Sequence, residues 1–202
     1  MVKMVFTDLD GTIVKDNRIS QKTKMAVYEL KEKGIGFSIA TGRHHKAVMD
    51  IVKELQIELP VICGNGAYIY NPLNSEIINV SYLPEEKASF VLEFCIEKQL
   101  NFLLYTRADI YGTTKSASSL KKALGPHIDI KTLHTDDFEN LPRHQVFKFL
   151  IMENNTEYLK SIRKELELVN DINLVQSRSD FLDVGPVGIN KGTAVKEVCS
   201  YL

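Results

Sequence analysis

Short apolar runs alternate with amphipathic stretches over the first third of the chain. Residues 2–7, 36–40 and 60–63 are apolar, and each predicts a buried strand that ends in a polar or glycine-rich loop. Between these runs, residues 21–33 and 44–55 carry apolar side chains at helical spacing, which predicts two helices. The resulting β-α-β-α-β order is typical of a parallel, doubly wound α/β sheet, with ligands at the carboxyl ends of its strands.

The pattern changes after the third predicted strand. Residues 67–82 are typical of a β-hairpin, and they are followed by an α-β-β-α-β-α-β-β pattern that predicts an inserted α+β unit. The last residues form an amphipathic helix. We therefore predict a core domain of residues 1–82 and 186–202, with a cap domain of residues 83–185 inserted into it.

The composition excludes several classes of protein. The sequence has 25 Lys and Arg against 26 Asp and Glu, a formal net charge of −1, so no general basic field attracts nucleic acid. The strongest apolar run, residues 146–152, contains Lys148 and is far too short to cross a bilayer. Asp8 and Asp10 come too early for a signal peptide. These features favour a cytoplasmic protein without nucleic-acid or membrane partners.

The three cysteines are odd in number and far apart in the sequence. Cys63, Cys95 and Cys199 form neither a CxxC pair nor a Cys/His ligand spacing. This argues against a disulfide framework or a structural zinc site. We interpret all three as buried apolar residues in a reducing compartment.

Two carboxylates follow the first predicted strand, in residues 8–12 (DLDGT). At this position they can converge on one phosphate group and one metal ion. Asp8 is placed to attack phosphorus and form an aspartyl-phosphate, and Asp10 to act as general acid and then as general base. Because paired carboxylates repel unless a cation lies between them, we expect Mg²⁺. An ordinary Asp-Gly turn is the alternative, which the preceding apolar strand disfavours.

Thr41, Gly42 and Lys191 are candidate phosphate ligands. The Thr41 hydroxyl and the Gly42 N–H end the second predicted strand and can donate to a phosphoryl oxygen, although a helix N-cap is the alternative for Thr41. Lys191 begins the last predicted helix, where it can neutralise the nucleophile and the phosphoryl group. A surface lysine at a helix start is the alternative, which the helix dipole slightly disfavours.

Four other polar residues near the strand ends carry weaker signals. Asn65, in residues 63–67 (CGNGA), either contacts the substrate or serves the turn. Arg43 is a candidate substrate-binding residue because it directly follows Gly42. His44 and His45 are interpreted as surface residues at a helix start, because no third metal ligand lies near them in the sequence.

Four segments together resemble the first three motifs of the haloacid-dehalogenase superfamily, Cof-type subgroup (subclass IIB capped phosphatases). They are residues 8–12 (DLDGT), 38–43 (SIATGR), 62–67 (ICGNGA) and 188–195 (GINKGTAV). The segments follow the family's order, and the predicted α+β insertion is similar to the family's cap. The resemblance implies a doubly wound parallel core, here incomplete, with an inserted cap. It also implies hydrolysis of small phosphorylated metabolites, such as sugar phosphates or phosphorylated cofactors.

The resemblance further implies a role for each motif residue. Asp8 would be the nucleophile and Asp10 the general acid/base. Mg²⁺ would lie on the Asp8 carboxylate and the Asp10 backbone carbonyl. The phosphate would be held by the N–H of Leu9 and by Thr41, Gly42 and Lys191.

The family's fourth motif, which resembles GDxxND and supplies a further metal carboxylate, does not occur before Leu202. We therefore expect impaired activity and weak Mg²⁺ binding in this form. In the resembled fold the first strand has neighbours on both sides. We accordingly expect residues 2–7 to expose one unpaired edge, so that this form is either a dimer or larger assembly joined near the first strand or else marginally stable.

Two alternative functions stay open at this point. One is a phosphomutase-like transferase, which uses the same chemistry. The other is a catalytically inactive phosphate- or metal-binding remnant, which would release no phosphate from an aryl phosphate in the presence of magnesium. A phospho-accepting receiver domain is discarded, because its accepting aspartate lies on the third strand, which here ends in residues 63–65 (CGN).

Overall fold

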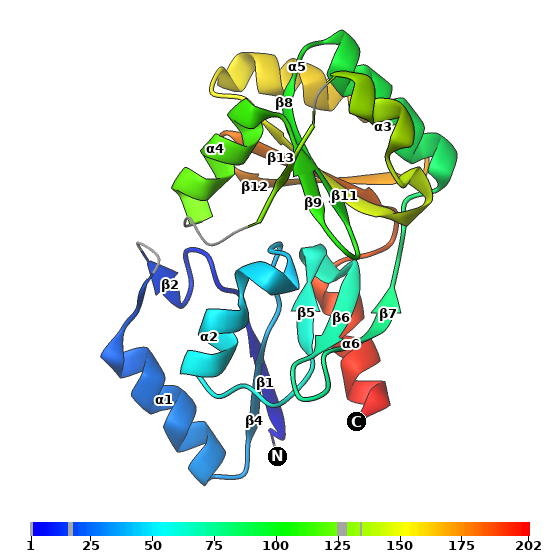
Figure 1. The fold of residues 1–202 in the computed structure, drawn as a ribbon. Helices are drawn as coiled ribbons and strands as arrows, with labels where there is room; N and C mark the ends of the chain where they lie inside the picture. The colour runs from blue at the N-terminus through cyan, green and yellow to red at the C-terminus, as the bar shows by residue number, and fades with distance from the viewer. Residues whose placement is uncertain (1, 16–17, 125–128, 134) are drawn as a thin grey trace. The chain divides into compact units, whose positions relative to one another are not determined.

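The computed structural model describes residues 2–15, 18–124, 129–133 and 135–202 (Figure 1). Contacts among the residues divide the chain into two compact units. The first is Met1–Val80 with Asn190–Leu202, and the second is Ser81–Ile189. None of the helices in the described part of the chain combines the length and apolar character needed to span a lipid bilayer.

The first unit contains the predicted parallel sheet, which confirms the α/β fold class. β1 (Met4–Thr7) pairs in parallel with β4 (Gly36–Ile39) along its whole length. Directly after β4, Ala40 makes a single parallel bridge to Ile62 in β5 (Val61–Cys63). The carboxyl ends of the three strands therefore meet at one edge, where ligands bind in open α/β sheets. In the described part of the chain, β4 is the only strand that pairs with β1.

Helices and antiparallel strands complete the first unit. Its helices are α1 (Gln21–Glu32), η1 (His45–Ala47), α2 (Met49–Glu54), η2 (Gly64–Gly66) and α6 (Lys191–Tyr201). Its remaining strands are β2 (Val14–Lys15) paired with β3 (Arg18–Ile19), and β6 (Tyr68–Asn71) paired with β7 (Glu76–Val80). The hairpin β2–β3 is too short to be visible in the hydropathy pattern. Figure 1 shows α6, in red, beside β5 and β6.

The predicted single helix over residues 44–55 is wrong. The segment forms the one-turn 3₁₀ helix η1 and then the short helix α2. Val48 lies between them with φ −122° and ψ −2°, outside the helical range, and its side chain is fully buried. A β-branched residue is stiff at χ1 and favours helices weakly. The buried Val48 therefore divides a segment whose hydrophobic spacing predicts one continuous helix.

The second unit is built on one mixed sheet. Its strand order is β10 (Lys131–Thr132), β9 (Ile110–Gly112), β8 (Asn101–Thr106), β11 (Val146–Met152), β13 (Phe181–Pro186) and β12 (Ile172–Arg178). All neighbours pair antiparallel except β10 and β9. Its helices are α3 (Glu85–Glu97), α4 (Thr114–Leu124), η3 (Thr135–Asn140), η4 (Arg143–Gln145) and α5 (Thr156–Leu166).

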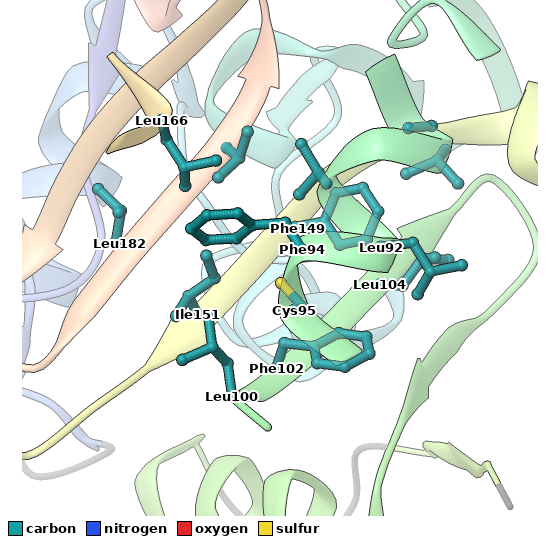
Figure 2. Close-up of a cluster of buried hydrophobic side chains, with 14 of the residues drawn as sticks. Leu92, Phe94, Cys95, Leu100, Phe102, Leu104, Phe149, Ile151, Leu166 and Leu182 are labelled. Atoms are coloured by element: carbon teal, nitrogen blue, oxygen red, sulfur yellow. The ribbon is translucent and has the colours of Figure 1, made fainter. Parts of the chain in front are cut away.

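One face of this sheet packs against α3 and α5. Alternate residues of three strands point into the cluster, among them Phe102 of β8, Phe149 of β11 and Leu182 of β13. Cys95 of α3 and Leu166 of α5 contribute from the helices, as Figure 2 shows. Because these side chains are nearly or fully excluded from solvent, their burial is the main source of stability for the unit.

The opposite face of the same strands carries a buried ion pair. Lys148 Nζ lies 2.5 Å from Asp183 Oδ1 and 4.8 Å from the centre of the Tyr105 ring. The side chains of Lys148 and Asp183 are 6% and 5% exposed. The two opposite charges are therefore paired at a position from which solvent is almost excluded. Burial, reinforced by the Asp183 charge, raises the pKa of the Tyr105 hydroxyl above its ordinary range.

The interpretation of all three cysteines as buried residues is wrong for one of them. Cys63 and Cys95 are buried, but Cys199 is exposed on α6. The inward face of this helix is occupied by Ala194 and Val198 instead. A neighbour in sequence on a helix lies about 100° away around the axis, so Cys199 cannot share the face of Val198.

The buried pair predicts a marked asymmetry between single and double substitutions. Lys148→Met leaves the Asp183 carboxylate buried without its cation and should lower the free energy of unfolding by about 3–5 kcal/mol. Lys148→Met combined with Asp183→Leu should lie within about 1 kcal/mol of the wild type or above it. Urea denaturation measures both. A single variant as stable as the wild type would show that the pair is not electrostatically coupled.

Candidate active site

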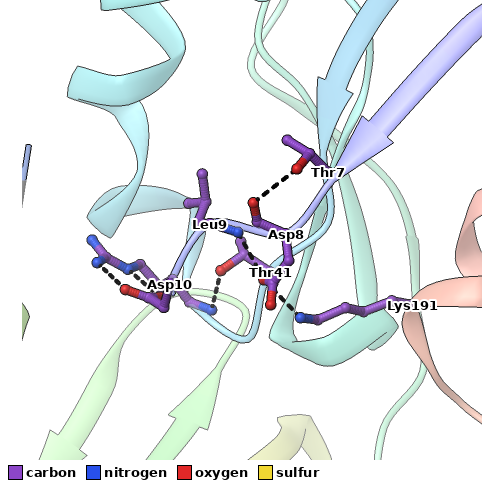
Figure 3. Close-up of polar contacts among 7 residues, drawn as sticks. Thr7, Asp8, Leu9, Asp10, Thr41 and Lys191 are labelled. Atoms are coloured by element: carbon purple, nitrogen blue, oxygen red, sulfur yellow. Dashed lines mark hydrogen bonds and ion pairs between the residues drawn. The ribbon is translucent and has the colours of Figure 1, made fainter. Parts of the chain in front are cut away.

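The Asp8 carboxylate lies directly after β1, at the carboxyl edge of the parallel strands. Its Oδ1 atom accepts the Leu9 N–H at 2.8 Å and lies 2.8 Å from Lys191 Nζ (Figure 3). The Thr7 hydroxyl donates to the Asp8 carbonyl at 3.1 Å. No hydrogen bond or ion pair to Asp8 Oδ2 is seen in the described part of the chain, and the side chain is 42% exposed. One carboxylate oxygen is therefore held in place while the carboxylate stays accessible.

A tight turn after Asp8 holds the two carboxylates in a fixed relation. The Leu9 carbonyl accepts N–H groups from Thr12, Ile13 and Val14, at 3.2, 3.1 and 2.9 Å. The Leu9 side chain is fully buried, which anchors the turn. Gly11 has φ +76°, a left-handed conformation that glycine adopts without strain.

The second carboxylate, Asp10, is bound by Arg43. Arg43 Nε donates to Asp10 Oδ2 at 2.9 Å, and Arg43 Nη2 donates to Asp10 Oδ1 at 2.6 Å. The guanidinium is 6% exposed, whereas the carboxylate is 51% exposed. Such a two-point contact fixes the plane of a carboxylate as well as its position. The predicted substrate-binding residue Arg43 is thus engaged with Asp10, and sequence reasoning did not anticipate this pairing across 33 positions.

Thr41 is fully buried and lies in the loop that directly follows β4. Its N–H donates to the Ile62 carbonyl at 2.9 Å, and its hydroxyl oxygen accepts the Arg43 N–H at 3.1 Å. The hydroxyl thus bonds within the loop and is not the helix N-cap of the alternative, since η1 is capped by His44. The hydroxyl hydrogen of Thr41 can still donate. Asn65 lies against Gly42: a Cβ atom on Gly42 would stand 2.7 Å from Asn65 Oδ1.

Lys191 is the first residue of α6, and its position is set by a capping box. The Asn190 side chain accepts the Thr193 N–H at 3.0 Å, and the Thr193 hydroxyl oxygen accepts the Asn190 N–H at 3.0 Å. From this cap the lysine side chain reaches Asp8 Oδ1. The structure thus brings Asp8, Leu9 and Lys191 together, although Lys191 is distant from the other two in sequence.

The interpretation of His44 as a surface residue is wrong. Its side chain is 1% exposed, and its Nδ1 accepts the Lys46 N–H at 3.3 Å. His45 is half-buried: its N–H donates to the Tyr68 hydroxyl oxygen at 2.6 Å, and its ring stacks on Tyr70 at 4.6 Å. Tyr68 and Tyr70, two positions apart on β6, therefore cover this loop. Their spacing of two positions on a predicted strand could have indicated that both tyrosine side chains lie on the same face of that strand.

The carboxylates suit a magnesium ion held together with a phosphate group. In proteins Mg²⁺ is commonly bound by one or two carboxylates, with water and substrate phosphate supplying the other oxygens. Asp8 supplies an accessible carboxylate, and Asp10 lies two residues away on the same turn. The described residues contain no cluster of three or more His, Cys, Asp or Glu side chains that could hold a metal. Asp8, with Asp10 two residues away, could therefore hold a divalent metal ion whose other ligands include water and substrate phosphate.

Comparison with known proteins gives consistent results. A family model described as haloacid dehalogenase-like hydrolase matches residues 5–202. The chain is 29% identical over 208 residues to an HMP-PP phosphatase of Klebsiella pneumoniae, covering 100% of this chain and 74% of that protein.

Solved structures share the fold. A haloacid dehalogenase-like hydrolase of B. subtilis matches with a TM-score of 0.87 and 20% identity, over 99% of this chain and 79% of that one. A sugar phosphatase of subclass IIB matches with a TM-score of 0.82 and 24% identity, over 99% and 76%. The family resemblance inferred from the motifs is therefore confirmed.

The histidine beside the site predicts a pH effect on stability. Burial, with a contribution from the Lys46 charge, lowers the pKa of His45 from 6.5 to about 4. Between these values the unfolded chain binds a proton that the folded chain does not, so stability falls as the pH drops from 7 to 4. After discounting for partial solvent access, we expect this residue to account for about 1 kcal/mol.

The test compares the wild type with His45→Phe, which keeps a ring over Tyr70. The loss of unfolding free energy between pH 7 and pH 4, measured in urea, should be smaller in the variant by that amount. Identical losses would mean that His45 titrates alike in the folded and unfolded chains.

Proposed function

The chain belongs to the haloacid dehalogenase-like hydrolases, and from this premise we propose that it is a phosphatase of small phosphorylated metabolites acting through an aspartyl-phosphate. The observation that carries the proposal is the Asp8 carboxylate, held by Lys191 and the Leu9 N–H, two residues from an oriented Asp10. The HMP-PP phosphatase of Klebsiella pneumoniae supports a small phosphorylated substrate. Sugar phosphates belong to the same chemical class.

In the first step, a carboxylate oxygen of Asp8 attacks the phosphorus atom. A new P–O bond forms to Asp8 while the P–O bond to the leaving group breaks. Asp10, in its protonated form, gives its proton to the leaving oxygen, so the product departs as an alcohol. The two contacts from Arg43 fix the position and the plane of the Asp10 carboxyl group before this proton transfer.

In the second step, water attacks the phosphorus atom of the aspartyl-phosphate. Asp10, now a carboxylate, takes a proton from this water, and the P–O bond to Asp8 breaks. Inorganic phosphate is released, Asp8 returns to its carboxylate form, and Asp10 is again protonated. One water is consumed for each ester hydrolysed.

The remaining residues stabilise the phosphoryl group while it is transferred. Lys191 supplies a positive charge beside the Asp8 carboxylate, whose Oδ1 the Leu9 N–H holds in place. In the proposed reaction the Thr41 hydroxyl and the Gly42 N–H donate to the phosphoryl oxygens. A bound Mg²⁺ ion would supply further neutralisation of the negative charge at the site. Asp8, with Asp10, would hold it.

Asp8→Asn is the direct test of the nucleophile. An amide cannot attack phosphorus as a carboxylate does, so release of phosphate from para-nitrophenyl phosphate should fall by about 10³-fold or more. Asp50→Asn, an isosteric change at an exposed position of α2, is the matched control and should keep wild-type turnover. Equal rates for wild type and Asp8→Asn would remove Asp8 from the mechanism. A wild type that binds phosphate without any turnover would favour the inactive remnant.

Removal of divalent metal provides an independent test. With a chelator present, phosphate release should fall to background, and excess Mg²⁺ should restore it, because two adjacent carboxylates and a phosphate repel one another without a cation. Colorimetric phosphate detection measures both states. Undiminished turnover in chelator would exclude a dissociable metal from the reaction.

A further inference from the structure

The turn Gly64–Gly66, between β5 and β6, contacts both halves of the proposed phosphate site. All three residues have positive φ angles, +58° for Gly64, +61° for Asn65 and +103° for Gly66. The Gly64 N–H donates to the Arg43 carbonyl at 3.0 Å, and the Asn65 N–H donates to the Thr41 carbonyl at 2.9 Å. The backbone of the turn is therefore bonded directly to the loop that carries Thr41 and Arg43.

The side chain of Asn65 also contacts this loop, at Gly42. A Cβ atom built on Gly42 would stand 2.7 Å from Asn65 Oδ1 and 3.3 Å from both Cγ and Nδ2. The carboxamide consequently lies in contact with the Gly42 backbone. Asparagine is also one of the few non-glycine residues that adopt a left-handed conformation readily. Its side chain and its backbone thus act on one loop.

At the other end of the turn, Gly66 packs closely against the backbone at the start of α6. A Cβ atom built on Gly66 would stand 2.4 Å from the Asn190 carbonyl oxygen and 3.1 Å from the Lys191 nitrogen. That carbonyl cannot rotate away freely, because it accepts the Ala194 N–H at 3.1 Å and the Thr193 hydroxyl at 2.8 Å. Any displacement of Asn190 therefore moves Lys191 with it.

Apolar packing between α6 and the strands β5 and β6 opposes any displacement of the helix away from the turn. Ile62 of β5 and Ile69 of β6 form one buried cluster with Ala194 and Val198 of α6. These side chains are at most 3% exposed, so a shift of the helix would open a cavity in the core. The contact at Gly66 is consequently a fixed spacing between the turn and the helix.

We propose that Gly64–Gly66 is a positioning element that sets the distance between Lys191 and Asp8 and the place of the Thr41-Gly42 donors. Asn65 and Gly66 act through these residues and not on the reacting atoms. The inference rests on the proposed phosphatase function, in which the Thr41-Gly42 loop and Lys191 serve one site; these two segments lie almost 150 positions apart in the sequence, and the turn contacts both. Small displacements of catalytic groups lower reaction rates by large factors, so an element that fixes their positions contributes to catalysis.

A double-mutant cycle tests the Gly66 contact. Gly66→Ala should lower kcat/KM for para-nitrophenyl phosphate by about 10²-fold by displacing Lys191, and Lys191→Ala by about 10³-fold. In the Lys191→Ala background, Gly66→Ala should add less than about threefold, because the residue it displaces is gone. Gly34→Ala is the matched control: Gly34 has φ +67° and open space where a Cβ would lie. It should stay within about twofold of the wild type. Losses that multiply in the double variant would overturn the proposal.

A rescue experiment tests the Asn65 contact. Gly42→Ala introduces the collision with Asn65 and should reduce kcat/KM by about 10²-fold. Adding Asn65→Gly removes the obstructing carboxamide and keeps the left-handed turn, so the double variant should regain at least about tenfold. A double variant no better than Gly42→Ala would show that Asn65 does not set the position of this loop.

A structural measurement separates this proposal from the proposed function. In a crystal structure of Gly66→Ala, the distance between Lys191 Nζ and Asp8 Oδ1 should exceed the 2.8 Å of the wild type by about 1 Å or more. An unchanged distance would refute the positioning role even if the enzyme is active. Conversely, a wild type without phosphate release would refute the proposed function, while a lengthened distance would still support the positioning role.

Discussion

The contact between Lys191 Nζ and Asp8 Oδ1 joins the start of α6 to the end of β1, and the candidate site depends on it. Both side chains are partly exposed, at 35% and 42%, and an ion pair in such surroundings stabilises a protein by about 1 kcal/mol or less. The pair is thus too weak to hold a helix in place. Its geometry has to come from elsewhere, from the Asn190 capping box, the close contact at Gly66 and the apolar packing of α6 on β5 and β6.

The same reasoning applies to the second carboxylate, with a different balance of forces. The Arg43 guanidinium is almost fully buried and makes two hydrogen bonds to Asp10, whereas the Asp10 carboxylate is half exposed. A buried cation with its donors satisfied fixes its partner in direction as well as distance. The Asp10 side chain is therefore half exposed to solvent while Arg43 holds its orientation from the protein side.

In the second unit, the two faces of one sheet carry different kinds of buried side chain, apolar on one face and polar on the other. Alternation along β8, β11 and β13 directs large apolar side chains toward α3 and α5. The residues between them place Lys148, Asp183 and Tyr105 together on the other face, where they are also buried. The polar cluster adds little net stability compared with apolar residues of the same size, but losing one member leaves an unpaired buried charge.

The sequence by itself determined the order of most of the longer helices and strands, the parallel character of the first sheet and the family. These depend on short-range patterns: apolar runs of strand length, helical spacing of apolar residues, and motifs a few residues long such as DLDGT. It also placed the candidate residues at strand ends, because parallel strands bring their carboxyl ends to one edge. Local patterns could not reveal the break at Val48, the burial of His44 or the exposure of Cys199.

Only the tertiary structure decided which of the candidate residues contact one another. The partnership of Arg43 with Asp10, the seat of Asn65 on Gly42 and the contact of Gly66 with Asn190 each join residues more than twenty positions apart. Whether such residues meet depends on how buried side chains pack between the elements that carry them. Packing of this kind is a property of the whole core and leaves no periodic signal in the residues it brings together.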